Sequence, residues 1–232
     1  MPEAAQHVTH QGVPRAFAQG NLDVMKVIRS MVDQISHGPR LHVRRISGGG
    51  PDMNIHEKNS LVEAGRAALN AAIGDMPMLA GIREEIARTQ PLKGERIAGC
   101  LHLTKETGVL IDLFHAASTE IVWTGGDEVS TQDEIAVLLS DRGITVFGWR
   151  NMLSNEVETA LKETLNHFDD GPTIIIDNGA RLITAALDEP QRFPSLKYMT
   201  EKTTEGCAKL RERASREDIP FPVFLVNEVV TK

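Results

Sequence analysis

Three polar residues between positions 96 and 107 have the types and spacing expected of a small-molecule site. His102, Thr104 and Glu106 come directly after the apolar run 96–101 and lie at the start of a helical pattern. If that run is a buried parallel strand, the three residues lie at its carboxyl end, where open α/β sheets bind their ligands. Imidazole titrates near neutral pH, so His102 is also a candidate for proton transfer. The stretch predicts a ligand site.

A structural role explains two of these residues equally well. His102 and Glu106 are four positions apart, but they straddle a strand-to-helix junction and are not a simple helical pair. His102 would then be a partly buried residue with a backbone partner, and Glu106 an acid that the helix dipole favours in a first turn. Spacing alone favours this structural reading.

A second polar group follows another apolar run. Asp177, Asn178 and Gly179 come directly after the three isoleucines 174–176. Asn-Gly is also a strong turn dipeptide, so a turn accounts for the group as well as a binding site does. Two strand ends with acids and amides favour a site but do not identify its ligand.

Apolar runs alternate with helical patterns from residue 96 onward, which predicts an α/β fold with a doubly wound, Rossmann-like parallel sheet. The five expected strands cover 97–101, 120–123, 145–149, 173–176 and 223–226. The expected helices between them cover 105–117, 131–141, 155–168, 181–187 and 204–216. Ser130 is expected to cap the second of these helices at its N-terminus.

The first 52 residues are predicted to form an extension, and 53–232 the α/β domain. Within the extension, apolar residues recur at helical spacing from 24 to 35, and the glycine-rich run 47–51 is typical of a flexible joint. We expect the helix of the extension to pack on the domain or on a second copy of it. Two more helices are expected at 60–72 and 78–89.

Composition excludes several classes of function. The net charge of −7 and the aromatic content of 4% argue against nucleic-acid binding. No apolar run is long enough to cross a membrane, and no secretory signal is visible, so we expect a cytoplasmic protein. The two cysteines, Cys100 and Cys207, have no neighbours at metal-ligand spacing, and we predict no metal site.

The run QPLKGERIAGCLHLTKETGVLIDLF resembles the opening of the substrate domain of the S-adenosyl-L-homocysteine hydrolase (adenosylhomocysteinase) family. The resemblance extends, with short insertions, from about residue 60 to the end. Its other matching pieces are MPMLAGIREEIARTQPLKGERIAGCLHLT, VSTQDEIAVLLSDRGITVFGWR, TLNHFDDGPTIIIDNGA, TEKTTEGCAKL and FPVFLVNEVVTK. The resemblance implies the fold and an adenosine-type ligand, with Glu106 at the adenine edge, Thr104 at the ribose and His102 at the 5′ side.

Other positions depart from the family's pattern. The family's second aspartate, which helps proton transfer, is Asn178 here, and an amide is not an acid or base near neutral pH. Lys202 replaces an acid that the family places on the ribose hydroxyls, which reverses the local charge and makes Lys202 a catalytic candidate. Lys232 corresponds to the family's lysine near the 3′-hydroxyl. We count Asp177, Asn178, Lys202 and Lys232 among the expected ligand-binding residues.

The family oxidises its substrate with bound NAD, and its nicotinamide domain has no counterpart in this sequence, which contains no GxGxxG motif. We therefore expect no cofactor, and no hydrolase activity from this chain alone. The leading hypothesis is a domain that binds adenosine or an S-adenosyl compound. The alternatives are a repurposed redox-free enzyme and a subunit that borrows a nicotinamide domain from a partner; a homo-oligomer is also expected.

Overall fold

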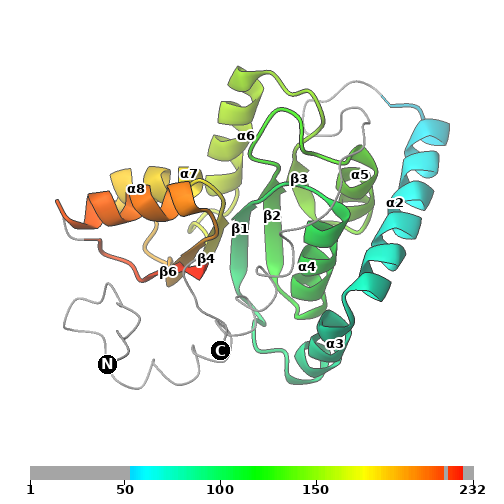
Figure 1. Ribbon diagram of the computed structural model, residues 1–232, viewed down its shortest axis with the longest axis horizontal. Helices are drawn as coiled ribbons and strands as arrows, with labels where there is room; N and C mark the ends of the chain where they lie inside the picture. The colour runs from blue at the N-terminus through cyan, green and yellow to red at the C-terminus, as the bar shows by residue number, and fades with distance from the viewer. Residues whose placement is uncertain (1–52, 217–218, 227–232) are drawn as a thin grey trace.

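A computed structural model describes residues 53–216 and 219–226, which form a parallel sheet covered by helices (Figure 1). Its strands are β1 (Arg96–Cys100), β2 (Glu120–Thr124), β3 (Thr145–Phe147), β4 (Ile174–Asp177), β5 (Tyr198–Glu201) and β6 (Val223–Leu225). Its helices are α2 (Ile55–Asp75), α3 (Pro77–Thr89), α4 (Lys105–Ala116), α5 (Asp133–Asp141), α6 (Ser154–Leu165), α7 (Arg181–Asp188), the 3₁₀-helix η2 (Pro190–Arg192) and α8 (Thr204–Ala214). The doubly wound α/β fold expected from the sequence is confirmed.

The strand order places the reversal of the sheet between β1 and β4. The six strands run β3-β2-β1-β4-β5-β6, and every neighbouring pair is parallel. From β1 the chain winds outward to β3, then crosses back to β4 and winds outward in the other direction. Ligands of open α/β sheets bind beyond the carboxyl ends of the strands at such a reversal. The segments after β1 and β4 are therefore the first place to look for a site.

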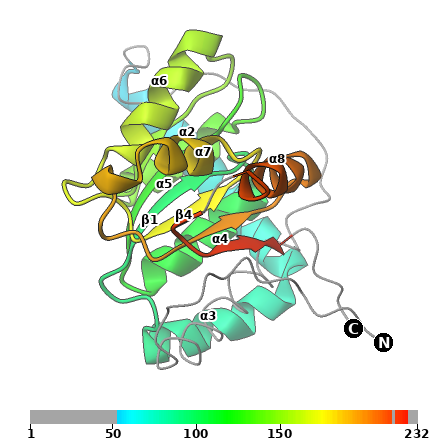
Figure 2. The same ribbon diagram turned by 90° about the vertical axis from the view of Figure 1, so that its left-hand side faces the viewer.

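Both faces of the sheet are buried, because alternate side chains of each strand point into different cores. Ile97, Trp123 and Ile176 belong to the core beneath α4 and α5. Ala98, Val122 and Ile175 belong to the core beneath α6 and α7. In Figure 2 the sheet separates α6, α7 and α8 from α3 and α4. Burial on both faces explains why these strands are continuously apolar and do not alternate with polar residues.

Helix α2 packs against α4 and α5, two of the helices that cover one face of the sheet. It begins at its N-cap Asn54, whose Oδ1 accepts the backbone N–H of Glu57 at 3.0 Å. Gly65 allows the close approach to α5, since a Cβ atom there would lie 2.1 Å from the carbonyl oxygen of Glu134. This helix was expected only over 60–72.

The sheet has one strand more than the sequence predicted. The additional strand is β5, in which two of the four residues, Thr200 and Glu201, are polar yet buried. Strand β3 ends at Phe147, two residues earlier than expected. Apolar content alone did not reveal β5, because half of its residues are polar. The buried carboxylate of Glu201 is satisfied by backbone N–H groups that follow β4 and β5.

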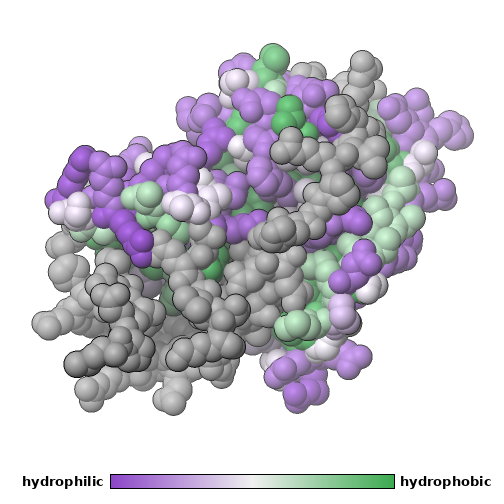
Figure 3. All heavy atoms as spheres, in the orientation of Figure 1, coloured by the Kyte–Doolittle hydropathy of each residue, from purple (hydrophilic) through white to green (hydrophobic). Residues whose placement is uncertain are grey.

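The expected extension, its helix and its joint lie outside the described residues. Among the described helices none is long and apolar enough to cross a membrane. Polar residues cover much of the described surface over α6 and α8 (Figure 3).

Candidate functional site

The reversal of strand order brings His102 and Asn178 together. His102 lies two residues after β1, and Asn178 directly follows β4. Atom Nδ2 of Asn178 lies 3.5 Å from Nε2 of His102, although the two residues are 76 positions apart. The two polar groups that the sequence placed at separate strand ends thus meet at the switch point.

The other ring nitrogen of His102 faces a carboxylate. Nδ1 lies 2.7 Å from Oδ2 of Asp127, which follows β2, and 2.8 Å from Oγ of Ser130. Burial disfavours ionisation of Asp127, but hydrogen bonds from His102 and from two backbone N–H groups outweigh it and hold its pKa well below the usual value. Asp127 is therefore a carboxylate at neutral pH.

The loop that carries Asp127 is held at several points. Oδ1 of Asp127 accepts the backbone N–H groups of Val129 at 2.8 Å and Ser130 at 2.7 Å. Arg181, at the start of α7, donates from Nη1 to the carbonyl oxygen of Gly126 at 2.5 Å. The position of Asp127 is thus fixed from both sides of the loop.

The prediction that Ser130 caps a helix is wrong. Helix α5 begins at Asp133, two residues later than expected, and its N-cap is Gln132. The side-chain oxygen of Gln132 accepts the backbone N–H of Lys105 at 2.8 Å, and the backbone N–H of Gln132 donates to the carbonyl oxygen of Leu103 at 2.8 Å. This bracing to the turn after β1 holds residues 130–132 in a loop, which leaves Ser130 beside His102.

Thr104 and Glu106 lie at the beginning of α4. Thr104 is its N-cap, and its Oγ1 accepts the N–H of Thr107 at 3.5 Å. Glu106 occupies the first turn, partly exposed, with its carboxylate 3.8 Å from Nζ of Lys105. Both residues thus follow His102 directly at the carboxyl edge of β1, and each also has the structural role that the sequence allowed.

Asp177 supports the site from inside the core. Its side chain is fully buried, and its two oxygens accept the backbone N–H groups of Asn178 at 2.8 Å and Ile183 at 2.9 Å. Burial, together with the neighbouring carboxylate of Glu201, raises the pKa of Asp177 to about 7, although the two backbone hydrogen bonds oppose the rise. The side chain fixes the turn that presents Asn178 and has no oxygen at the surface for a ligand.

Glu201 is a second buried acid that shapes this turn. Its Oε1 accepts the N–H groups of Gly179 at 3.0 Å and Thr203 at 2.6 Å, and its Oε2 accepts that of Ala180 at 2.8 Å. Gly179 and Ala180 both have positive φ, 88° and 58°. The carboxylate therefore compensates a turn that an alanine rarely adopts.

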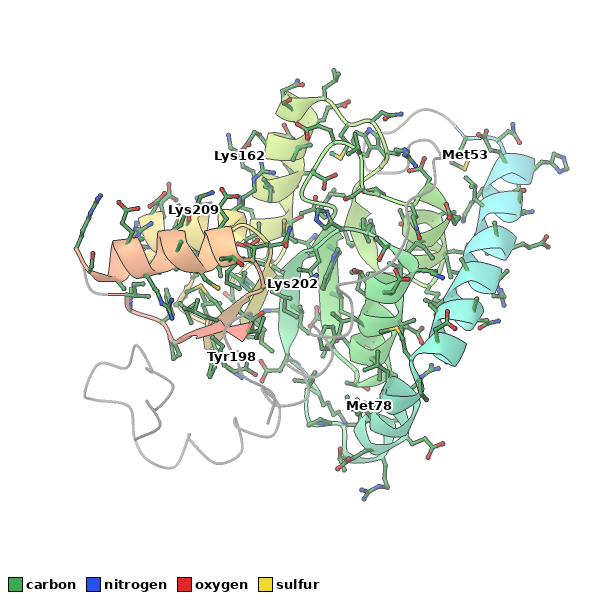
Figure 4. The ribbon with its side chains drawn as sticks, in the orientation of Figure 1. Met53, Met78, Lys162, Tyr198, Lys202 and Lys209 are labelled. Atoms are coloured by element: carbon green, nitrogen blue, oxygen red, sulfur yellow. The ribbon has the colours of Figure 1, made fainter. Side chains whose placement is uncertain are left out.

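Lys202 lies at the same edge, directly after β5. Its backbone N–H donates to the carbonyl oxygen of Asp177 at 3.2 Å, which ties it to the end of β4. In Figure 4 Lys202 lies near the centre of the molecule, whereas Lys162 and Lys209 lie on the outer helices α6 and α8. Lys232 lies outside the described residues.

Several backbone N–H groups beside the helix N-termini at this edge have partners within the protein. The carboxylate of Glu201 accepts those of Gly179 and Ala180, directly before α7, while Gln132 and Thr104 accept those of Lys105 and Thr107 in α4. A dinucleotide's pyrophosphate needs such N–H groups to be available. A pyrophosphate at the switch point would have to compete with Glu201, Gln132 and Thr104 for these N–H groups. In residues 53–216 and 219–226, no group of three or more histidine, cysteine, aspartate or glutamate side chains is arranged to hold a metal ion.

Sequence reasoning missed Asp127, which contributes the shortest side-chain contact to His102. The signal was present in Gly125-Gly126-Asp127, where an acid follows the apolar run of β2. It would have been recognised if β2 had been assigned as the neighbour of β1. Together, Asp127 and His102 form a carboxylate–imidazole pair, an arrangement that orients a histidine for proton transfer.

A comparison with family models identifies what most of this chain is similar to. Residues 53–192, more than half of the chain, match the family model described as S-adenosyl-L-homocysteine hydrolase. The matched range includes His102, Thr104, Glu106, Asp127 and Asn178.

Proposed function

Because the chain belongs to the S-adenosyl-L-homocysteine hydrolase family, we propose that it binds an adenosine-type compound at this site without redox chemistry on NAD. Adenosine, S-adenosylhomocysteine and S-adenosylmethionine are the candidate ligands. His102, Thr104, Glu106, Asn178 and Lys202 would contact the ligand, and Asp177 would hold the turn behind Asn178.

The observation that carries the proposal is the meeting of His102 and Asn178 across the reversal between β1 and β4. This is the edge of a doubly wound sheet at which ligands bind. A neutral nucleoside needs hydrogen-bond donors and acceptors there, and imidazole, hydroxyl, carboxylate and amide groups supply both kinds. The N–H groups already bound by Glu201, Gln132 and Thr104 favour such a ligand over one that is bound through its phosphates.

Calorimetric titration of the full chain with each of the three candidate ligands tests the proposal. We expect saturable binding of at least one of them, weakened by His102→Ala. A matched control is His115→Ala, because His115 is exposed in the last turn of α4, away from the carboxyl edge of the sheet. No binding of any of the three at millimolar concentration would contradict the proposal.

The carboxylate–imidazole pair supports a second candidate function, a redox-free reaction on the same class of ligand. His102 would accept a proton from the substrate, with Asp127 stabilising the imidazolium that forms. Incubation with S-adenosylhomocysteine and S-adenosylmethionine, followed by mass spectrometry of the products, separates turnover from binding. A product that the wild type forms and His102→Ala does not would establish the enzyme.

A further inference from the structure

The two nitrogens of the His102 ring have different surroundings. Nδ1 lies 2.7 Å from a carboxylate oxygen of Asp127, which accepts hydrogen bonds and donates none. Nε2 lies 3.5 Å from the amide nitrogen of Asn178, which only donates. Oγ of Ser130, 2.8 Å from Nδ1, can donate or accept and so fits either tautomer. A neutral ring satisfies Asp127 and Asn178 together in one tautomer alone, with its hydrogen on Nδ1 and its lone pair on Nε2.

We propose that Asp127 is the positioning residue of this site, which fixes His102 as the Nδ1–H tautomer and so makes Nε2 a hydrogen-bond acceptor for a ligand hydroxyl. Asp127 acts through the histidine and does not contact the ligand itself. The role of Nε2 toward a ligand rests on the proposed function, whereas the tautomer does not.

Three features keep Asp127 available for this task. Its low pKa keeps it ionised, so that it accepts at neutral pH. Its Oδ1 is committed to the N–H groups of Val129 and Ser130, which leaves Oδ2 to face the ring. The bond from Arg181 to Gly126 anchors the preceding residue. The carboxylate is thus oriented before any ligand arrives, which is what an oriented histidine requires.

Asn178 completes the arrangement. A carboxylate at this position would accept a hydrogen from Nε2 and so compete with Asp127 for the ring hydrogen. An amide nitrogen instead donates toward Nε2 and needs the lone pair there. The amide that replaces the family's second aspartate therefore supports the same tautomer as Asp127.

The Asp127→Asn variant gives the sharpest test, because the loop dictates how the new amide is oriented. Its oxygen must occupy the Oδ1 position to keep the N–H groups of Val129 and Ser130, so its NH₂ group faces Nδ1 of His102. That donor requires a lone pair on Nδ1, and the hydrogen moves to Nε2. A corresponding aspartate-to-asparagine change in a serine protease triad also produces the wrong tautomer.

Nitrogen-15 NMR of the full chain at mildly alkaline pH distinguishes a protonated ring nitrogen from a bare one. The signal of His102 is assigned as the one that His102→Gln removes. We expect the wild type to carry the hydrogen on Nδ1, Asp127→Asn to carry it on Nε2, and Glu128→Gln, a change at the next residue along the loop, to resemble the wild type. The proposal would be overturned if His102 of the wild-type protein carries its hydrogen on Nε2, or if Asp127→Asn has the same tautomer as the wild type.

Two further measurements keep the result interpretable. Thermal unfolding shows whether Asp127→Asn is folded. If it is not, Asp127→Ala replaces it, and loss of the uniform Nδ1–H state is then the expected result.

Calorimetry with adenosine and 5′-deoxyadenosine tests whether Nε2 accepts a hydrogen bond from a ligand hydroxyl. The wild type should prefer adenosine by roughly tenfold, and Asp127→Asn should lose that preference. The NMR measurement of the tautomer needs no ligand, so it tests the role of Asp127 even if adenosine does not bind.

Discussion

Oε2 of Glu201, the last residue of β5, accepts the backbone N–H of Ala180 at 2.8 Å, where α7 begins. With Gly179 and Thr203 also bound to the same carboxylate, this buried acid joins the ends of β4 and β5 into one rigid edge. The turn that presents Asn178 depends on it.

We expect Glu201→Ala to lower the free energy of unfolding by about 3 kcal/mol or more, because it leaves several donors to a charged group without their partner. The neighbouring Glu205→Gln is the matched control, since Glu205 is exposed and its carboxylate pairs with Lys209 on the same helix. Urea unfolding of both variants measures the difference. If the two variants unfold at the same urea concentration, the support that Glu201 gives the turn is refuted.

Two glycines of α2 should respond oppositely to alanine. Gly65→Ala places a methyl group 2.1 Å from the carbonyl oxygen of Glu134, so we expect a loss of roughly 2 kcal/mol as α2 moves away from α5. Gly74→Ala meets no atom within 4 Å and should stabilise the helix by up to about 1 kcal/mol. Thermal unfolding compares the two. Equal effects would show that α2 does not pack on α5 through Gly65.

The fold could be predicted further than the site, and the reasons differ for particular residues. Ile97 and Ile175 lie in runs that are apolar because both sheet faces are covered, so their strands were visible in the sequence. Strand β5 was not visible, since Thr200 and Glu201 are polar, and the partners of the buried Glu201 carboxylate include residues that follow β4. His102 and Asn178 were each found, but their contact depends on β1 and β4 being neighbours, which the order of elements along the chain does not specify.

Stability should fall as pH rises from about 4 to about 7. Burial raises the pKa of both Asp133 and Asp177 from 3.8 to about 7, so in this interval the folded protein binds more protons than the unfolded chain. Stability falls with pH wherever the folded state holds the extra protons, by about 1.4 kcal/mol for each unit of pKa difference.

The measurement is urea unfolding across that interval for the wild type and Asp133→Asn. The asparagine keeps an oxygen for the N–H of Arg150, which Asp133 accepts at 2.8 Å, but it does not ionise. Its stability relative to the wild type should therefore improve as pH rises. A relative stability that does not change with pH would contradict the burial of an ionisable Asp133.

The purified protein should contain no NAD. Glu201 occupies the N–H groups of Gly179 and Ala180, directly before α7, and the exposed carboxylate of Glu205 in the first turn of α8 would repel a pyrophosphate. Mass spectrometry of the denatured protein detects any released cofactor, and a homocysteine-release assay with added NAD detects turnover. Stoichiometric NAD, or turnover that His102→Ala abolishes, would instead support an NAD-dependent site.

The central claim is that an adenosine-type ligand binds at the carboxyl edge of β1, and one calorimetric comparison tests it most directly. The variants are Glu106→Gln, at that edge, and Glu120→Gln, which is exposed where β2 begins at the opposite edge. We predict that Glu106→Gln weakens adenosine binding roughly ten- to a hundredfold, through the loss of a hydrogen bond to a charged group, while Glu120→Gln binds like the wild type. Equal affinities in all three proteins would contradict the assignment of the site.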